Sequence, residues 1–295
     1  MPHARAKDGT KLFFEEAGSG AALLFIHEYA ADYRSWEPQM RYFARRYRCI
    51  TYSSRGYPGS DLPASGDAYS YEHFRDDAIA VLDHLGVDKA HIVGLSMGGY
   101  STVQIGITYP QRARSLTLAG AGSGSEAWYI DEFRKHSRDT ADALERQGMD
   151  EAAKNYGSGA TRAPFAVKDP RGYAEAMRIF FDRDAQGAAH TLRGFQMGRP
   201  SLYDFADDIA KIALPTLIIV GDEDDPCLEP SLFLKQTIPA SGLAVFPKTG
   251  HAVNLEEPAL FNATLENFLA TVEQSRWIAR DTPVTPHRAR KWASR

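Results

Sequence analysis

The sequence predicts a doubly wound α/β fold, built on a mostly parallel sheet and interrupted by a helical cap insertion. Fully apolar runs such as Leu23-Leu24-Phe25-Ile26 are typical of strands that are buried on both faces of a parallel sheet. These runs alternate with helix-like stretches at short spacing, which is the pattern of βαβ units. Residues 125–210 break this rhythm, and it resumes at residue 215. A chain of 295 residues is long enough for one large domain with such an insertion.

Turn-forming residues precede the first buried strand, and residues 1–22 are therefore expected to form a small β-meander. Ser70 is a suitable N-cap for a helix over residues 71–85, whose apolar positions follow i, i+3, i+4 spacing and which Gly86 ends. The elements expected from there to residue 119 alternate in the order 23–26 (strand), 36–46 (helix), 49–52 (strand), 71–85 (helix), 90–93 (strand), 100–107 (helix) and 115–119 (strand).

The second half of the chain begins with residues 125–210, which hold several helix-like stretches and many large apolar residues but no clear strand. We interpret this segment as a cap that packs over the carboxyl edge of the sheet. Strands are expected again at 215–221 and 243–246, and a last helix from about Pro258. The predicted organisation is a core at residues 1–124 and 211–275, a cap at 125–210 and a solvated basic tail at 276–295.

Composition and charge exclude several classes of function. A formal net charge of −4 leaves no electrostatic footprint for nucleic acid or an anionic membrane. No apolar run approaches the about 20 residues of a membrane span, and the first residues lack the apolar core of a signal peptide. We therefore expect a cytoplasmic protein with a small-molecule partner, and a homodimer is left open.

Neither the cysteines nor the histidines of the sequence predict a bound group. Cys49 and Cys227 lie far apart and are interpreted as packing residues. The nine histidines show no metal-ligand spacing, and no dinucleotide-binding glycine loop follows the first buried strand. No cofactor and no metal are expected.

The segment Gly94-Leu95-Ser96-Met97-Gly98-Gly99 carries the strongest functional signal. It follows the apolar run 90–93 and leads into a helix-like stretch. A tight strand-to-helix turn pushes a serine hydroxyl out at the top of a sheet, and the flanking glycines leave room for neighbouring backbone. The helix start supplies free N–H groups that favour a developing oxyanion. This context favours a nucleophilic serine over a small residue that only fits the turn.

A serine needs an imidazole base and a carboxylate that orients this base before it becomes a good nucleophile. Two loops that follow late strands offer these groups. One contains Asp222, Asp224 and Asp225, and the other contains Gly250-His251. Since ligands of open α/β sheets lie outside the carboxyl ends of the strands, both loops are expected to face the serine. At this point the three aspartates remain alternatives.

These motifs, together with His27 and the loop Arg55-Gly56-x-x-Gly59-Ser60-Asp61, resemble those of the α/β-hydrolase superfamily. The likeness runs from about residue 10 to residue 270, and the order Ser…Asp…His is the one that this family uses.

The resemblance implies roles for particular residues of this chain. Ser96 is the nucleophile, His251 the general base and acid, and Asp224 the orienting carboxylate, with Asp225 as the next choice. Backbone N–H groups of Tyr29 and Met97 form the oxyanion hole. Some members carry the acid after the preceding strand, where this chain offers only Glu126, and we favour Asp224.

Glu28 departs from the family pattern, which usually has a glycine after the histidine. A carboxylate facing a developing oxyanion would repel it by about 4 kcal/mol at 4 Å with an effective dielectric near 20. We therefore expect Glu28 to pair with Arg34 or Arg55, to be neutral, or to face a cationic group of the substrate. Glu28 and the cap residue Trp128 are the candidate substrate-binding residues.

The predicted function is hydrolysis of a small-molecule carboxylic ester through an acyl-serine intermediate. A serine at position 96 argues against the dehalogenases and epoxide hydrolases of the family, which use aspartate there. Three alternatives remain: hydrolysis of a carbon–carbon bond in a diketone-like substrate, the more distant alternative of cofactor-free oxygenation, and a ligand receptor with a vestigial triad.

Overall fold

The computed structural model describes residues 2–150 and 159–280, and its centre is an eight-stranded sheet. The strand order is β1-β2-β4-β3-β5-β6-β7-β8, in which β1 and β2 run antiparallel to their neighbours and all other pairs are parallel. The predicted fold class is confirmed. The strands are β1 (His3–Arg5), β2 (Lys11–Ala17), β3 (Ala22–Ile26), β4 (Arg48–Tyr52), β5 (Ala90–Leu95), β6 (Ala113–Ala119), β7 (Thr216–Gly221) and β8 (Ser241–Phe246).

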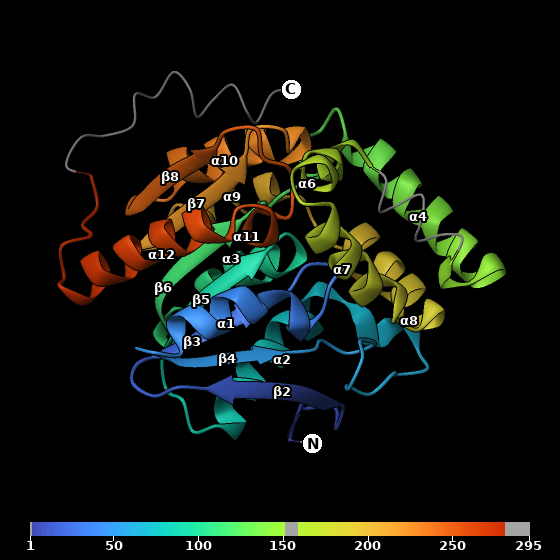
Figure 1. Ribbon diagram of the computed structural model, residues 1–295, viewed down its shortest axis with the longest axis horizontal. Coiled ribbons are helices and arrows are strands. Elements are labelled where there is room, and N and C mark those ends of the chain that lie inside the picture. The colour runs from blue at the N-terminus through green and yellow to red at the C-terminus, as the bar shows by residue number, and fades with distance from the viewer. Residues whose placement is uncertain (1, 151–158, 281–295) are drawn as a thin grey trace.

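Helices cover both faces of the sheet, and several gather at one end of it (Figure 1). The α-helices of the described residues are α1 (Glu37–Phe43), α2 (Tyr71–His84), α3 (Met97–Thr108), α4 (Ile130–Gln147), α6 (Ala163–Lys168), α7 (Pro170–Phe181), α8 (Ala185–Thr191), α9 (Ala206–Ile209), α10 (Asp225–Thr237), α11 (Val253–Glu256) and α12 (Pro258–Glu273). The shorter or wider turns are η1 (Tyr33–Trp36), η2 (Gly66–Tyr69), η3 (Pro110–Arg112), η4 (Ala160–Arg162), the π-helical η5 (Leu192–Met197) and η6 (Leu202–Phe205).

Strand β3 shows why the central strands read as unbroken apolar runs. Its side chains alternate between the two faces of the sheet, and both faces are covered. Leu23 and Phe25 belong to the core layer that contains residues of α1 and α12. Leu24 and Ile26 belong to the other layer, with residues of α2 and α3. The apolar run of β3 therefore contributes to the core on both faces of the sheet.

The predicted elements of the core agree with the structure, apart from two helices that were not predicted. Ser70 caps α2 by accepting a hydrogen bond from the backbone N–H of His73. Residues 1–22 contain the expected turn at Gly9 between the antiparallel strands β1 and β2, and β2 then pairs with β4. Helices α10 and α11 were not predicted, and α10 contains a proline, Pro230, that interrupts the helical pattern in the sequence.

The described residues between β6 and β7 form helices, turns and loops but no strand. We name this segment, the described part of residues 120–215, the helical insertion. Figure 1 shows α4, α7 and α8 together at one end of the sheet. The division of the chain into core and cap stays a prediction. Residues 151–158, in the predicted cap, and 281–295, in the predicted basic tail, lie outside the described residues.

Residues 276 and 278–280 of the predicted tail are exposed, as expected, but Trp277 between them is half-buried. The Trp277 ring lies 4.7 Å from that of Phe268, and its Nε1–H donates to the carbonyl of Ala240 at 2.8 Å. The indole therefore anchors this segment to α12 and β8. Within the described ranges, no helix combines the length and the apolar character that crossing a membrane requires.

Candidate active site

Ser96 lies at the sharp turn between β5 and α3 and has a backbone conformation that few non-glycine residues adopt. Its φ is 55° and its ψ is −110°. The turn is possible because the flanking glycines lack side chains: a Cβ on Gly94 would lie 2.1 Å from the carbonyl oxygen of Gly98. The Ser96 N–H donates to the carbonyl of Ala119 at 2.8 Å, which ties the turn to β6. The strained turn presents the serine to a cavity at the carboxyl end of the sheet.

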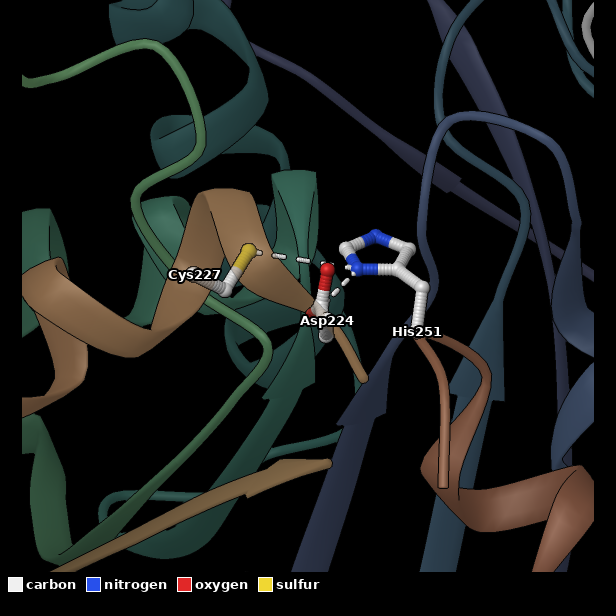
Figure 2. Close-up of side chains that lie close together, drawn as sticks. All are labelled: Asp224, Cys227 and His251. Carbon is white, nitrogen blue, oxygen red and sulfur yellow. Dashed lines mark hydrogen bonds and ion pairs between the residues drawn. The ribbon is translucent and has the colours of Figure 1, made fainter. Parts of the chain in front are cut away.

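His251 and Asp224 form a buried hydrogen-bonded pair beside this turn. The Nδ1–Oδ2 distance is 2.7 Å (Figure 2). Because the carboxylate only accepts, Nδ1 is the donor, and Nε2 is left to accept a proton when the ring is neutral. Burial lowers the pKa of His251, but the charge and hydrogen bond of Asp224 outweigh burial and raise the pKa above its usual value. Ser96, Asp224 and His251 line the same cavity.

The structure distinguishes the three aspartates of the loop after β7. Asp224 is buried with 1% exposure, whereas Asp222 and Asp225 are exposed. Asp222 accepts a hydrogen bond from the backbone N–H of Thr249 at 3.2 Å, and Asp225 begins α10. Glu126, the alternative after β6, is buried, and burial raises its pKa to about 7. Asp224 is the carboxylate that holds His251.

The loop after β3 is organised by His27, whose ring is buried. Its Nε2 accepts from the backbone N–H of Ser54 at 3.0 Å, so its Nδ1 carries the hydrogen and donates to the carbonyl of Glu28 at 2.7 Å. Burial lowers the pKa of His27 to about 4, which keeps the ring neutral. In a trans peptide the N–H points opposite to the C=O, so the Tyr29 N–H points away from the His27 ring.

The second candidate oxyanion donor is the N–H of Met97, which begins α3 and has no acceptor within that helix. The two predicted donors lie on adjacent segments, because a Cβ on Gly98 would be 2.2 Å from the carbonyl oxygen of Ile26, at the end of β3. The arrangement suits an oxyanion hole made of backbone N–H groups.

Glu28 pairs with Arg162 of the helical insertion, which corrects the predicted partners. Arg162 Nη2 donates to Glu28 Oε2, and both side chains are buried. Arg34 instead forms ion pairs with Asp32 and Asp182, and Arg55 forms ion pairs with Asp77 and Asp8. Burial raises the pKa of Glu28, but the charges of Arg162 and His251 outweigh it and lower the pKa. Glu28 is therefore an ionised carboxylate.

The cavity measures about 340 Å³ and lies between the predicted triad and the helical insertion. Its walls from the insertion include aromatic, aliphatic and polar side chains, namely Tyr129, Phe133, His136, Ser137, Thr140, Arg162, Leu192, Gln196 and Arg199. The volume is at the small end of the range for small-molecule sites. It suits a small ligand with some polar groups.

Trp128 is not part of the cavity wall, contrary to the predicted role in substrate binding. Its side chain is 68% exposed and its ring lies 5.4 Å from that of Tyr129. Tyr129 and Phe133 both line the cavity. Tyr129, the N-cap of α4, and Phe133 lie one helical turn apart, whereas Trp128 precedes the helix.

Cys227 is a neighbour of the site that the sequence analysis missed. Figure 2 shows its thiol and Asp224 on the same side of the His251 ring. The Sγ atom lies 3.9 Å from His251 Nδ1 and donates to the carbonyl of Gly120 at 3.2 Å. No sequence signal beyond the spacing of three from Asp224 could have indicated this contact.

Asp224, Cys227 and His251 also form the one group among the described residues whose donor atoms are close enough to hold a metal ion. Burial raises the pKa of the Cys227 thiol well above its usual value, whereas a metal ligand must be a thiolate. The Nδ1 atom of His251 is engaged by Asp224. These observations favour a hydrogen-bonded network over a metal centre.

A family model described as the alpha/beta hydrolase fold matches residues 21–258. The chain therefore belongs to this family and is an alpha/beta hydrolase enzyme. It is 26% identical over 253 residues to 3-oxoadipate enol-lactonase 1 of Acinetobacter baylyi, which covers 85% of this chain and 90% of the relative. It is 25% identical to a non-heme haloperoxidase of Rhodococcus erythropolis, over 91% of this chain and 99% of the relative.

Among solved structures, a thermophilic esterase from Thermogutta terrifontis superposes with a TM-score of 0.82. The two chains are 25% identical, and the match covers 92% of this chain and 98% of the esterase. The relatives are hydrolases and a haloperoxidase by name, so the reaction of this chain has to be argued from its site.

Proposed function

We propose that this protein hydrolyses a carboxylic ester of a small molecule through an acyl-serine intermediate, with Ser96, His251 and Asp224 as the triad. The proposal is carried by one observation: a serine held at positive φ shares a cavity with a buried imidazole whose Nδ1 binds a carboxylate. A lactone is a cyclic ester, so the enol-lactonase and esterase relatives agree with this chemistry.

The reaction would proceed in two similar halves. His251 Nε2 takes the proton of Ser96, and the serine oxygen attacks the carbonyl carbon. The oxyanion binds the N–H groups of Met97 and Tyr29, and the imidazolium then gives its proton to the leaving alcohol. In the second half, water replaces the serine as the attacking group and releases the acid.

A fluorophosphonate probe tests the nucleophile directly. We expect covalent labelling at Ser96 in the native protein, identified by peptide mass spectrometry, and a burst of alcohol from a chromogenic short-chain ester. A panel of diketones measured beside the esters tests carbon–carbon hydrolysis. Tight ligand binding without labelling or turnover would instead support a receptor.

The cavity wall predicts which aromatic residue selects the substrate. Phe133→Ala should enlarge the cavity and change the ratio of kcat/KM between short and long acyl chains by about tenfold, as expected when a few methylene groups gain or lose contact. Trp128→Ala is the matched control, because its side chain is 68% exposed and off the wall. Both variants are to be measured on the same series of esters. An equal change of the kcat/KM ratio in Trp128→Ala would contradict the assignment of Phe133 to the cavity wall.

A further inference from the structure

Two adjacent residues of η4 connect the helical insertion to both loops of the predicted catalytic machinery. The carbonyl of Thr161 accepts the backbone N–H of His251 at 2.8 Å. The next residue, Arg162, pairs with Glu28 on the oxyanion loop. We name Thr161 and Arg162 the strap.

The strap packs closely against the loop that contains His251. A Cβ on Gly250 would lie 2.1 Å from the Thr161 carbonyl oxygen, so the approach depends on a glycine immediately before His251. At the other contact, the side chain of Arg162 is 7% exposed and that of Glu28 is 3% exposed. Buried ion pairs are costly to desolvate and depend on good geometry. Both contacts therefore define where the two loops lie relative to each other.

The charged and titratable groups around His251 come from four segments. Asp224 Oδ2 lies 2.7 Å from Nδ1, and Cys227 Sγ lies 3.9 Å from the same nitrogen. Glu28 Oε2 lies 4.0 Å from Nε2, the nitrogen that is predicted to exchange protons with Ser96. Arg162 is bound to that same carboxylate oxygen. His251 is therefore flanked by two carboxylates, and a guanidinium balances the second of them.

We propose that Glu28 and the strap are positioning residues, which set the geometry of the oxyanion loop against His251 and balance the charge at its Nε2. This inference rests on the proposed acyl-serine function. It explains why a glutamate is tolerated beside the oxyanion donors: its charge is neutralised by the insertion rather than by the core. The helical insertion then contributes to the assembly of the catalytic site as well as to the cavity wall.

The single variant Glu28→Gln, which changes the net charge, and the double variant Glu28→Gln/Arg162→Met, which does not, separate positioning from electrostatics. Glu28→Gln removes one negative charge at Nε2 and leaves the guanidinium unbalanced. Both changes oppose protonation of His251, so the acidic limb of the kcat/KM profile should move to lower pH by about one unit. The double variant has no net charge change, and its acidic limb should return to within about 0.3 units of the wild type.

The contribution of these residues to positioning is measured as a change in kcat. Both variants lose the Glu28–Arg162 ion pair that joins the insertion to the oxyanion loop, so kcat should fall about 10- to 100-fold in each, with a smaller change in KM. Asp182→Asn is the matched control: it breaks another ion pair between the helical insertion and the core, to Arg34 at 2.9 Å, with Asp182 59% exposed. It should change neither kcat nor the pH profile.

The outcomes distinguish this inference from the proposed function. If the wild type is labelled by the fluorophosphonate but Glu28→Gln keeps its kcat and its acidic limb, the positioning inference is wrong and the proposed function stands. If Glu28→Gln does not fold, the double variant Glu28→Gln/Arg162→Met provides the test, and a kcat equal to that of the wild type would overturn the inference. If the wild type is neither labelled nor active on any ester, the proposed function falls and this inference falls with it.

Discussion

Ser96→Ala should abolish ester turnover and leave the fold intact. The variant removes the only atom that forms the acyl-enzyme bond in the proposed reaction, and the loss should be about 10⁶-fold in kcat, as when a triad serine is removed elsewhere. Alanine and serine are both non-glycine residues, so the strain at a φ of 55° is carried equally by the two proteins. The backbone bond from position 96 to Ala119 is retained.

The measurement is kcat on a chromogenic ester together with the melting temperature. Ser101→Ala is a suitable control, because Ser101 is buried on the same helix and its hydroxyl donates to the carbonyl of Met97 at 3.1 Å. The control should keep nearly all of its activity. If Ser96→Ala retained activity within about tenfold of the wild type, the acyl-serine mechanism would be wrong.

The sheet could be predicted from the sequence because its strands are buried on both faces. β3 and β5 consist almost entirely of apolar residues, and such runs bounded by turn residues leave few alternatives. The antiparallel end of the sheet was harder to predict. The pairing of β2 with β4 is set by contacts between residues far apart in the sequence, such as Phe14 and Tyr52, which are 38 residues apart, and local pattern carries no information on it.

The residues of the candidate triad could be placed because each follows a strand, and parallel strands end at one edge of the sheet. The partner of Glu28 could not be placed in this way. Arg162 is 134 residues away in sequence and lies in a segment where only helices, without a repeated register, were expected. Arg34 and Arg55 were predicted because they lie on loops expected at the same edge of the sheet as Glu28. In the structure each of these arginines forms an ion pair with an aspartate instead.

Asp224→Asn should lower kcat by about 10⁴, the second largest effect that we expect. The carboxylate accepts the Nδ1–H of His251 at 2.7 Å and thereby leaves Nε2 free to take the proton of Ser96. An amide in its place can donate to Nδ1, which favours the tautomer with hydrogen on Nε2, and it cannot stabilise the imidazolium. Since the charge of Asp224 raises the pKa of His251 against the effect of burial, its loss should also lower that pKa.

The same substitution at the neighbouring aspartates provides the control for this prediction. Asp222 and Asp225 are exposed, so their asparagine variants should retain activity within a factor of about three, as for surface changes away from the site. The three variants are to be compared by kcat and by the rate of fluorophosphonate labelling of Ser96, which depends on the same imidazole. If Asp225→Asn lost activity while Asp224→Asn kept it, Asp225 would be the orienting carboxylate in place of Asp224. The buried position of Asp224, with 1% exposure and its Oδ2 on the imidazole, is the reason to expect the opposite.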